Sequence, residues 1–180
     1  MSQKQTGKEI YIFLASSSEL ELERVHAGDL INDINSALAN TDVRVRLLKW
    51  ENFNPSFQGE RKQSEYNEKI KKSHIFIAMF REKTGKFTLE EVEIAVETNK
   101  QTGSPHELYC FIQEQYEKND NIDTLKAKLN ADWVIRTFLD IKDFKQKLIN
   151  ILIPYLIKNG INITETDNFI QINPINIFKK

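Results

Sequence analysis

Short apolar runs of strand length, each followed by a longer segment with helical spacing, constrain this chain most. The runs at 10–15 (IYIFLA) and 75–80 (IFIAMF) are apolar at every position. A strand that is apolar on both faces is typical of a parallel sheet covered by helices. We predict five strands, at 10–15, 43–50, 75–80, 107–113 and 133–139.

The segments between these runs have the spacing of amphipathic helices. In the first, over 19–39, apolar residues recur at intervals of three and four and form a stripe that packs a helix on a sheet. These residues are Ala27, Leu30, Ile31, Ile34 and Leu38. Ser18 and Glu21 stand three apart at the start, which predicts a capping box. Further helices are predicted over 61–73, 88–102, 123–129 and 144–158. The alternation predicts an α/β fold with a parallel sheet, helices on both faces and a strand order near 2-1-3-4-5.

Composition and charge narrow the class of protein. The chain has 180 residues, 40% of them hydrophobic, and a formal net charge of −1. This is a globular composition, and the charge gives no electrostatic reason to bind nucleic acid or an anionic membrane. The single cysteine, Cys110, excludes an internal disulfide. The polar N-terminus has no secretory signal, and no apolar run approaches the roughly 18 residues of a membrane span. We therefore expect a soluble cytoplasmic protein.

The predicted organisation is one domain with two short flanks. Residues 1–9 are expected to form a disordered tail, and residues 10–160 to form the domain. The extension over 161–180 mixes Asn with Ile and Phe and has no helical period. It is either an added edge strand or a linker to a further domain or partner.

Several common chemistries are poorly supported by the sequence. The six glycines are too far apart for a dinucleotide-binding or phosphate-binding loop. The three histidines share no metal-ligand spacing with one another or with Cys110, so no metal site is predicted. The GxSxG pattern of many hydrolases is absent as well. Among catalytic options, carboxylate chemistry is left.

In an open α/β sheet, ligands bind beyond the carboxyl ends of the strands, near the point where strand order reverses. The loops over 16–19, 49–59 and 81–87 should therefore converge. Phe87, Glu91 and Ala95 follow the third strand four residues apart, so they share one face of a helix. Glu91 is the candidate catalytic group of a nucleotide-cleaving site. The other interpretation is that Glu91 only faces solvent on an amphipathic helix.

Two motifs, one at the first strand and one after the third strand, resemble those of the TIR and TIR-like family. They are Ile12-Phe13-Leu14-Ala15-Ser16-Ser17-Ser18-Glu19 and Phe87-x3-Glu91-x3-Ala95. The resemblance covers 10–158 and is nearest to the prokaryotic, antiphage-defence branch. Members that cleave NAD carry an aromatic residue, usually Trp, four residues before the catalytic Glu. Phe87 departs from Trp but keeps the spacing, which favours Glu91 over Glu90 and Glu93.

This resemblance implies a flavodoxin-like fold that hydrolyses or cyclises NAD, with Glu91 as the catalytic residue. NAD is then the substrate, and no cofactor is expected. Ordinary glycoside hydrolysis needs two carboxyl groups, because the leaving oxygen must be protonated. Nicotinamide in NAD already carries a positive charge and leaves as a neutral base. One carboxylate that stabilises charge at the anomeric carbon is therefore enough.

Seven further residues are predicted to bind substrate, each with a structural alternative. The hydroxyls of Ser16, Ser17 and Ser18 either meet phosphate or ribose or only cap a helix. Trp50 either stacks on a base or belongs to the core. Phe57 lies in a loop that in this family gates the site and mediates self-assembly. It either contributes to that role or only packs to hold the loop in place. Arg81 either meets phosphate or lies in a solvated turn, and Phe87 supplies the aromatic of the motif.

Three functions compete. The first is an NAD glycohydrolase or cyclase that is activated by self-association. The second is a non-catalytic TIR-like adaptor that only recruits partners. The third is a nucleoside deoxyribosyltransferase or nucleotide N-glycosidase, which shares the fold and a helix-borne Glu. The leaving base of these enzymes is neutral, so they need an additional acid or a base-binding Asp, and Asp29 and Asp42 are poorly placed for that.

Overall fold

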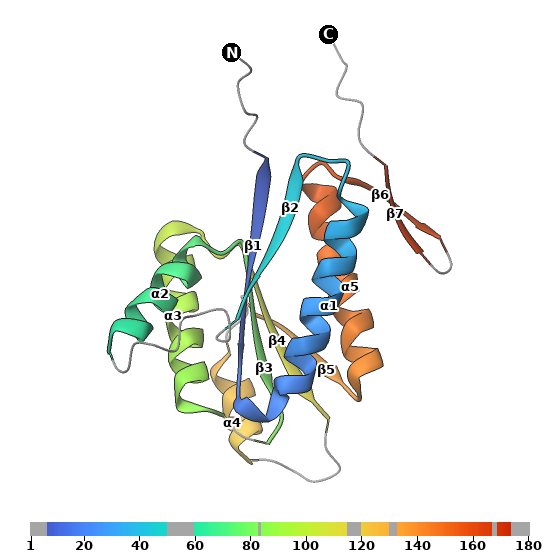
Figure 1. The fold of residues 1–180 in the computed structure, drawn as a ribbon. Coiled ribbons are helices and arrows are strands. Elements are labelled where there is room, and N and C mark those ends of the chain that lie inside the picture. Colours follow the sequence, from blue (N-terminus) through green and yellow to red (C-terminus); the bar gives the residue numbers. More distant parts are fainter. Residues whose placement is uncertain are drawn as a thin grey trace.

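The central sheet has five parallel strands in the order β2-β1-β3-β4-β5 (Figure 1). The strands are β1 (Lys8–Ser16), β2 (Val43–Leu48), β3 (Ile75–Phe80), β4 (Glu107–Gln113) and β5 (Trp133–Phe138). The structure is a computed structural model, and it describes residues 7–49, 60–82, 84–114, 120–129, 133–166 and 169–173. The predicted α/β class, the flavodoxin-like parallel sheet and its strand order are confirmed.

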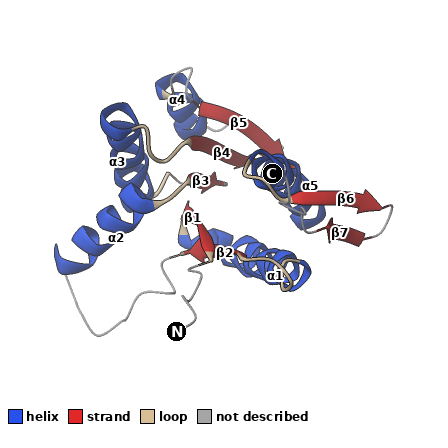
Figure 2. Ribbon diagram, turned by 90° about the horizontal axis from the view of Figure 1, so that it is seen from above, coloured by secondary structure: helices blue, strands red, loops and turns tan. Residues whose placement is uncertain are grey.

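Helices cover both faces of this sheet. Figure 2 shows α1 and α5 on one face and α2, α3 and α4 on the other. Their bounds are α1 (Glu21–Ala37), α2 (Glu60–Lys72), α3 (Lys86–Thr102), α4 (Asp120–Lys128) and α5 (Ile141–Lys158). The order of strands and helices along the chain therefore matches the predicted alternation.

Alternate residues of the central strands supply two separate hydrophobic cores. Ile12 and Ile77 belong to the core beneath α1 and α5. Phe13 and Phe76 belong to the core on the other face, where their rings stack with centroids 5.6 Å apart. All six residues of β3 are buried. The continuous apolar runs are thus explained by burial on both faces of the sheet.

The start of α1 differs from the prediction. A 3-10 turn, η1 (Ser18–Leu20), precedes the helix, and Leu20 is the N-cap residue of α1. No side chain caps either element, and the Ser17 hydroxyl donates a hydrogen bond to Glu19 Oε1 instead. The predicted capping box at Ser18 is therefore wrong, because the extra turn moves Ser18 away from the N-cap position.

The two ends of the described chain also differ from the predicted flanks. β1 begins at Lys8, so the last two residues of the predicted tail belong to the sheet. After α5, the strands β6 (Asn162–Thr166) and β7 (Phe169–Asn173) pair antiparallel as a separate two-stranded sheet (Figure 1). β6 contacts α5, and β7 contacts α1. Over these residues the extension is therefore not an edge strand of the main sheet, and its role as a linker to a further domain or partner stays a prediction.

Candidate active site

The strand order reverses between β1 and β3, which are neighbours in the centre of the sheet. Their carboxyl ends lie side by side, with Ser16 of β1 paired to Met79 of β3. From this edge the chain continues from β1 into α1 on one face and from β3 into α3 on the other (Figures 1 and 2). Ligands of open α/β sheets bind in the crevice outside such a reversal.

Two of the three loops predicted to converge do meet at this edge. The backbone N–H of Glu82 donates to Glu19 Oε1 at 3.0 Å. Residues 16–18, which we call the serine turn, lie at the carboxyl end of β1. A Cβ atom added at Gly85 would lie 3.9 Å from Cβ of Ser17, so the N-terminus of α3 lies beside the serine turn. The third loop holds Trp50 and Phe57, which lie outside the described residues. Their predicted roles stay predictions.

Glu91 lies on the buried face of α3. Its side chain is 9% exposed, and it shares this face with Thr88, Ala95 and Thr98, which are also buried. These residues recur at intervals of three and four, the spacing of one helix face. α3 packs against β1 and β3. The prediction that Glu91 is more than a solvated surface residue thus agrees with its burial.

The Glu91 carboxyl group has an unusual environment. Within the described part of the chain it makes no hydrogen bond or ion pair, although polar groups at such burial are normally paired. Burial, and secondly the negative charge of Glu90, raise its pKa to about 7. At neutral pH the group is therefore divided between its charged and protonated forms. Side chains on a helix generally lean toward its N-terminus, which for α3 is the end beside Gly85 and Ser17.

Phe87 does not share the buried environment of Glu91. Its ring is 68% exposed, whereas Ala95, at the other end of the predicted motif, is fully buried. The predicted common face is thus buried only from Glu91 onward. Thr88, the next residue, is only 3% exposed, so the buried face of α3 runs through Thr88, Glu91, Ala95 and Thr98 and leaves Phe87 to one side of it. A role for Phe87 in substrate binding stays a prediction.

The serine turn is anchored from beneath by a buried arginine. Arg24 is 1% exposed, and its Nη1 donates to Ser16 Oγ at 2.9 Å and to the Ser17 carbonyl at 2.8 Å. Ser16 and Ser17 are half-buried, and Ser18 is exposed. Because the Ser16 oxygen already accepts from Arg24, its hydroxyl proton is directed to another acceptor. A substrate contact of Ser16, Ser17 or Ser18 stays a prediction.

Arg81 was predicted to contact phosphate, and the structure surrounds it with protein acceptors. Its Nη2 donates to Glu23 Oε1 at 2.6 Å, and its Nη1 donates to the Glu19 carbonyl at 3.2 Å. Its Nε donates to Gln113 Oε1. The guanidinium group therefore links α1, η1 and β4 in this arrangement, and a phosphate contact stays a prediction.

Two residues of this region were missed by the sequence analysis. Glu23 is 2% exposed and Arg24 is 1% exposed, which is rare for charged side chains. A signal for both was present, because they stand four and three residues before Ala27 and so extend the apolar stripe of α1. Charged residues on a buried stripe indicate a structural or functional ion pair.

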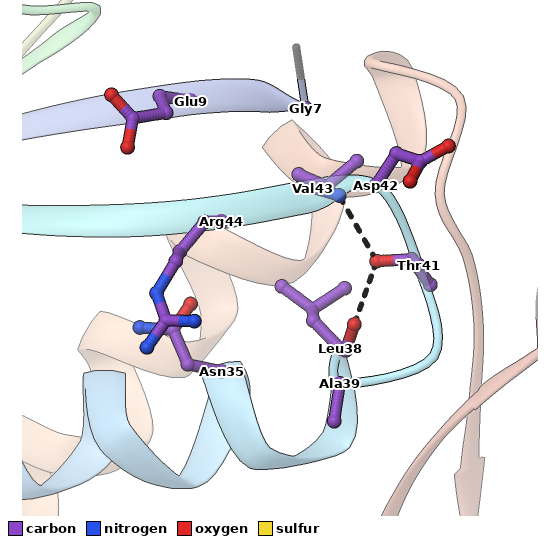
Figure 3. A pocket seen from close by; sticks show the side chains of 9 residues that line it. All are labelled: Gly7, Glu9, Asn35, Leu38, Ala39, Thr41, Asp42, Val43 and Arg44. Carbon is purple, nitrogen blue, oxygen red and sulfur yellow. Dashed lines mark hydrogen bonds between the residues drawn. The ribbon is translucent and has the colours of Figure 1, made fainter. Parts of the chain in front are cut away.

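A cavity of about 500 Å³ lies at the opposite edge of the sheet (Figure 3). It is formed by the beginnings of β1 and β2 and the end of α1. Protein groups already satisfy two of the polar side chains that line it: Thr41 bonds to Leu38 and Val43, and Asn35 bonds to Val45. This cavity is far from the reversal point and is not part of the candidate site.

Neither a metal centre nor a membrane span is found in the described residues. No three His, Cys, Asp or Glu side chains among them are grouped so that they could hold a metal ion. None of the helices described is long and apolar enough to cross a bilayer.

Comparison with known proteins gives no family assignment. No protein-family model matches the sequence, and no curated protein matches it. Among solved structures, the CMP N-glycosidase BcmB of Clostridium botulinum is similar over 78% of this chain and 98% of its own, with a TM-score of 0.49 and 18% identity. The Flv1 flavodiiron core of Synechocystis sp. PCC6803 is similar over 83% of this chain and 38% of its own, with a TM-score of 0.40 and 16% identity. The resemblance to the TIR family stays a prediction.

Proposed function

We propose that this protein cleaves the N-glycosidic bond of a nucleotide, with Glu91 beside the reacting ribose. The observation that supports this proposal is a glutamate residue that is only 9% exposed and whose carboxyl group has no hydrogen bond or ion pair among the described residues. It follows the strand at which the sheet order reverses. Polar groups that are buried and left unpaired are candidates for contact with a substrate.

One carboxyl group in two protonation states can serve this reaction. The charged form stabilises positive charge that develops at the anomeric carbon when the base departs. The protonated form can donate a proton to a departing base. With a pKa of about 7, Glu91 has access to both forms near neutral pH.

NAD+ is the first substrate class, as the resemblance to the TIR family implies. Its nicotinamide leaves as a neutral base and needs no acid, so the charged form of Glu91 suffices. Cleavage of NAD+ should then increase as the pH rises through about 7. Self-association, which the resemblance also implies, belongs to this proposal and is tested by varying the protein concentration.

A nucleotide with a neutral base, such as CMP, is the second class. The specific observation in its favour is the raised pKa of Glu91, because a neutral base leaves more readily when it is protonated. In this case the protonated form of Glu91 itself would donate the proton to the departing base. Cleavage should then decrease as the pH rises through about 7.

The experiment is a substrate panel with two variants. Concentrated protein is incubated with NAD+, with CMP and with deoxycytidine, and free nicotinamide or cytosine is measured by chromatography from about pH 5 to about pH 9. We expect the native protein to cleave one of these substrates. The rate of this cleavage should be at least about 100-fold lower in Glu91→Gln. Glu93→Gln, which alters an exposed residue of the same helix, should retain it. Cleavage that Glu91→Gln leaves unchanged contradicts the site, and no cleavage at any concentration favours the adaptor.

A further inference from the structure

Hydrogen bonds connect the carboxyl ends of β1, β3, β4 and β5 in one series, which we call the edge belt. The belt consists of the side chains of Ser17, Glu19, Glu23, Arg81 and Gln113. Arg81, which directly follows β3, is its centre. Its three donor nitrogens each bond to a different residue: Glu19 in η1, Glu23 at the start of α1, and Gln113 at the end of β4.

The belt continues beyond Arg81 in both directions. Toward β1, Glu19 Oε1 accepts from Ser17 Oγ at 3.1 Å and from the Glu82 N–H at 3.0 Å. Toward β5, Gln113 Nε2 donates to the Leu139 carbonyl at 3.3 Å. The serine turn and the loop that leads into α3 are therefore held together by two contacts of Glu19 and by Arg81.

The ion pair at the centre of the belt is poorly suited to a purely stabilising role. Glu23 is 2% exposed, its Oε1 accepts from Arg81, and its buried Oε2 has no hydrogen-bond partner among the residues that the structure describes. Buried ion pairs often contribute little net stability, and a buried oxygen without a donor is destabilising. What such a pair does provide is a fixed geometry between the elements that it joins.

The same geometry bears on the position of Glu91. Arg81 and Glu82 begin the loop that ends at Gly85, the N-cap of α3, and Gly85 lies beside Ser17. α3 carries Glu91 on its second turn. A shift of this loop relative to the serine turn would displace the carboxyl group from anything bound between them, and displacements of about 1 Å can be costly in catalysis.

We propose that Arg81 is a positioning residue that, through Glu23 and the edge belt, fixes the helix carrying Glu91 relative to the serine turn. This inference rests on the proposed function, and it replaces a contact between Arg81 and substrate phosphate. The buried Glu23 carboxylate, together with Glu19 and Gln113, holds the Arg81 guanidinium group in one orientation. Releasing Arg81 to an anion would leave the Glu23 carboxylate buried without its ionic partner, which is strongly unfavourable.

Steady-state kinetics of three variants test this role. Arg81→Lys keeps the charge but loses the fork of donors, Gln113→Ala removes one acceptor, and Arg44→Lys is a control at an exposed arginine of β2. For whichever nucleotide is cleaved, and for its unphosphorylated nucleoside, we expect kcat to fall at least about tenfold in Arg81→Lys, with KM changed less than about threefold. Gln113→Ala should show a smaller loss of kcat. A rise in KM confined to the phosphorylated substrate would overturn the proposal, because it indicates direct phosphate binding.

A second readout does not depend on activity. The free energy of unfolding of the native protein, minus that of Glu91→Gln, changes with pH as Glu91 titrates. The same difference can be measured between Arg81→Lys and the double variant Arg81→Lys/Glu91→Gln. We expect the midpoint of this difference to move toward the ordinary glutamate value, because a loosened loop admits water to Glu91. A midpoint unchanged by Arg81→Lys would overturn the positioning role even if the variant is less stable. If the native protein cleaves nothing, the proposed function fails, and this readout still decides whether the belt positions Glu91.

Discussion

Replacing Glu91 with Gln should make the protein more stable at neutral pH, although it removes the proposed catalytic group. The folded state raises the pKa of Glu91 from its ordinary value of 4.5 to about 7, mainly by burial. At 1.36 kcal/mol for each pKa unit, the charged form destabilises the fold by about 3 kcal/mol. Gln has nearly the same shape and carries no charge at any pH, so it avoids this cost.

The sign of the pH dependence follows from the direction of the shift. A group with a raised folded-state pKa supports the fold fully below its unfolded pKa, here near 4.5, and this support is lost as the pH rises through about 7. The free energy of unfolding of the native protein, minus that of Glu91→Gln, should therefore fall by about 3 kcal/mol between about pH 4 and about pH 8. Subtracting the variant cancels the titration of the other groups.

Urea unfolding followed by circular dichroism measures this difference at intervals of pH. Glu93→Gln is the matched control, because Glu93 is exposed on the same helix. Its difference from the native protein should stay nearly constant with pH. A flat difference for Glu91→Gln, within about 0.5 kcal/mol, would refute the argument that Glu91 is held in a desolvated environment.

Three further predictions concern other parts of the fold. Asn35→Ala should lower the free energy of unfolding by about 1–2 kcal/mol in urea titration, because the Asn35 amide bonds both to N–H and to C=O of Val45 on the edge strand, at 2.8 and 2.9 Å; no loss would contradict the importance of this contact. Gly103→Ala should lower the free energy of unfolding by about 1 kcal/mol in the same assay, because Gly103 is the C-cap of α3 with φ 75°, a backbone conformation that disfavours a side chain. The space around Gly103 is open, so no steric clash adds to this cost. His74 Nδ1 accepts the Tyr11 N–H at 3.0 Å, and burial is the main cause that lowers its pKa below 6.5. The stability that its neutral ring provides should be complete above about pH 6.5 and lost as the pH falls through the folded-state pKa, and an NMR titration midpoint at or above 6.5 would contradict this.

The sheet could be predicted from the sequence because its determinants are local. The run Ile75–Phe80 is apolar at every position, and the structure buries it completely at the centre of the sheet. Similarly, the residues of the predicted α1 stripe from Ala27 to Leu38 are all buried. Hydrophobic periodicity of this kind is read directly from neighbouring residues.

The candidate site was predicted less completely, because its contacts join residues that are far apart in the chain. Arg81 bonds to Glu23, 58 residues earlier, and to Gln113, 32 residues later. No local pattern contains these pairs, so the sequence predicted for Arg81 either a phosphate contact or a place in a solvated turn. The burial of Glu91 and the exposure of Phe87 likewise depend on which side of α3 packs against β1 and β3. Spacing alone places both residues on one face.

The central claim is that the Glu91 carboxyl group acts on the ribose of a nucleotide. Its most direct test follows the anomeric proton of NAD+ and of CMP by ¹H NMR, with native protein and Glu91→Gln side by side at neutral pH. With the native protein, we predict that the anomeric signal of one nucleotide is replaced by that of the released ribose product, while the ring-proton signals of the free base appear. With Glu91→Gln, the anomeric signal of the nucleotide should persist. Equal loss of the signal in both samples would contradict the claim.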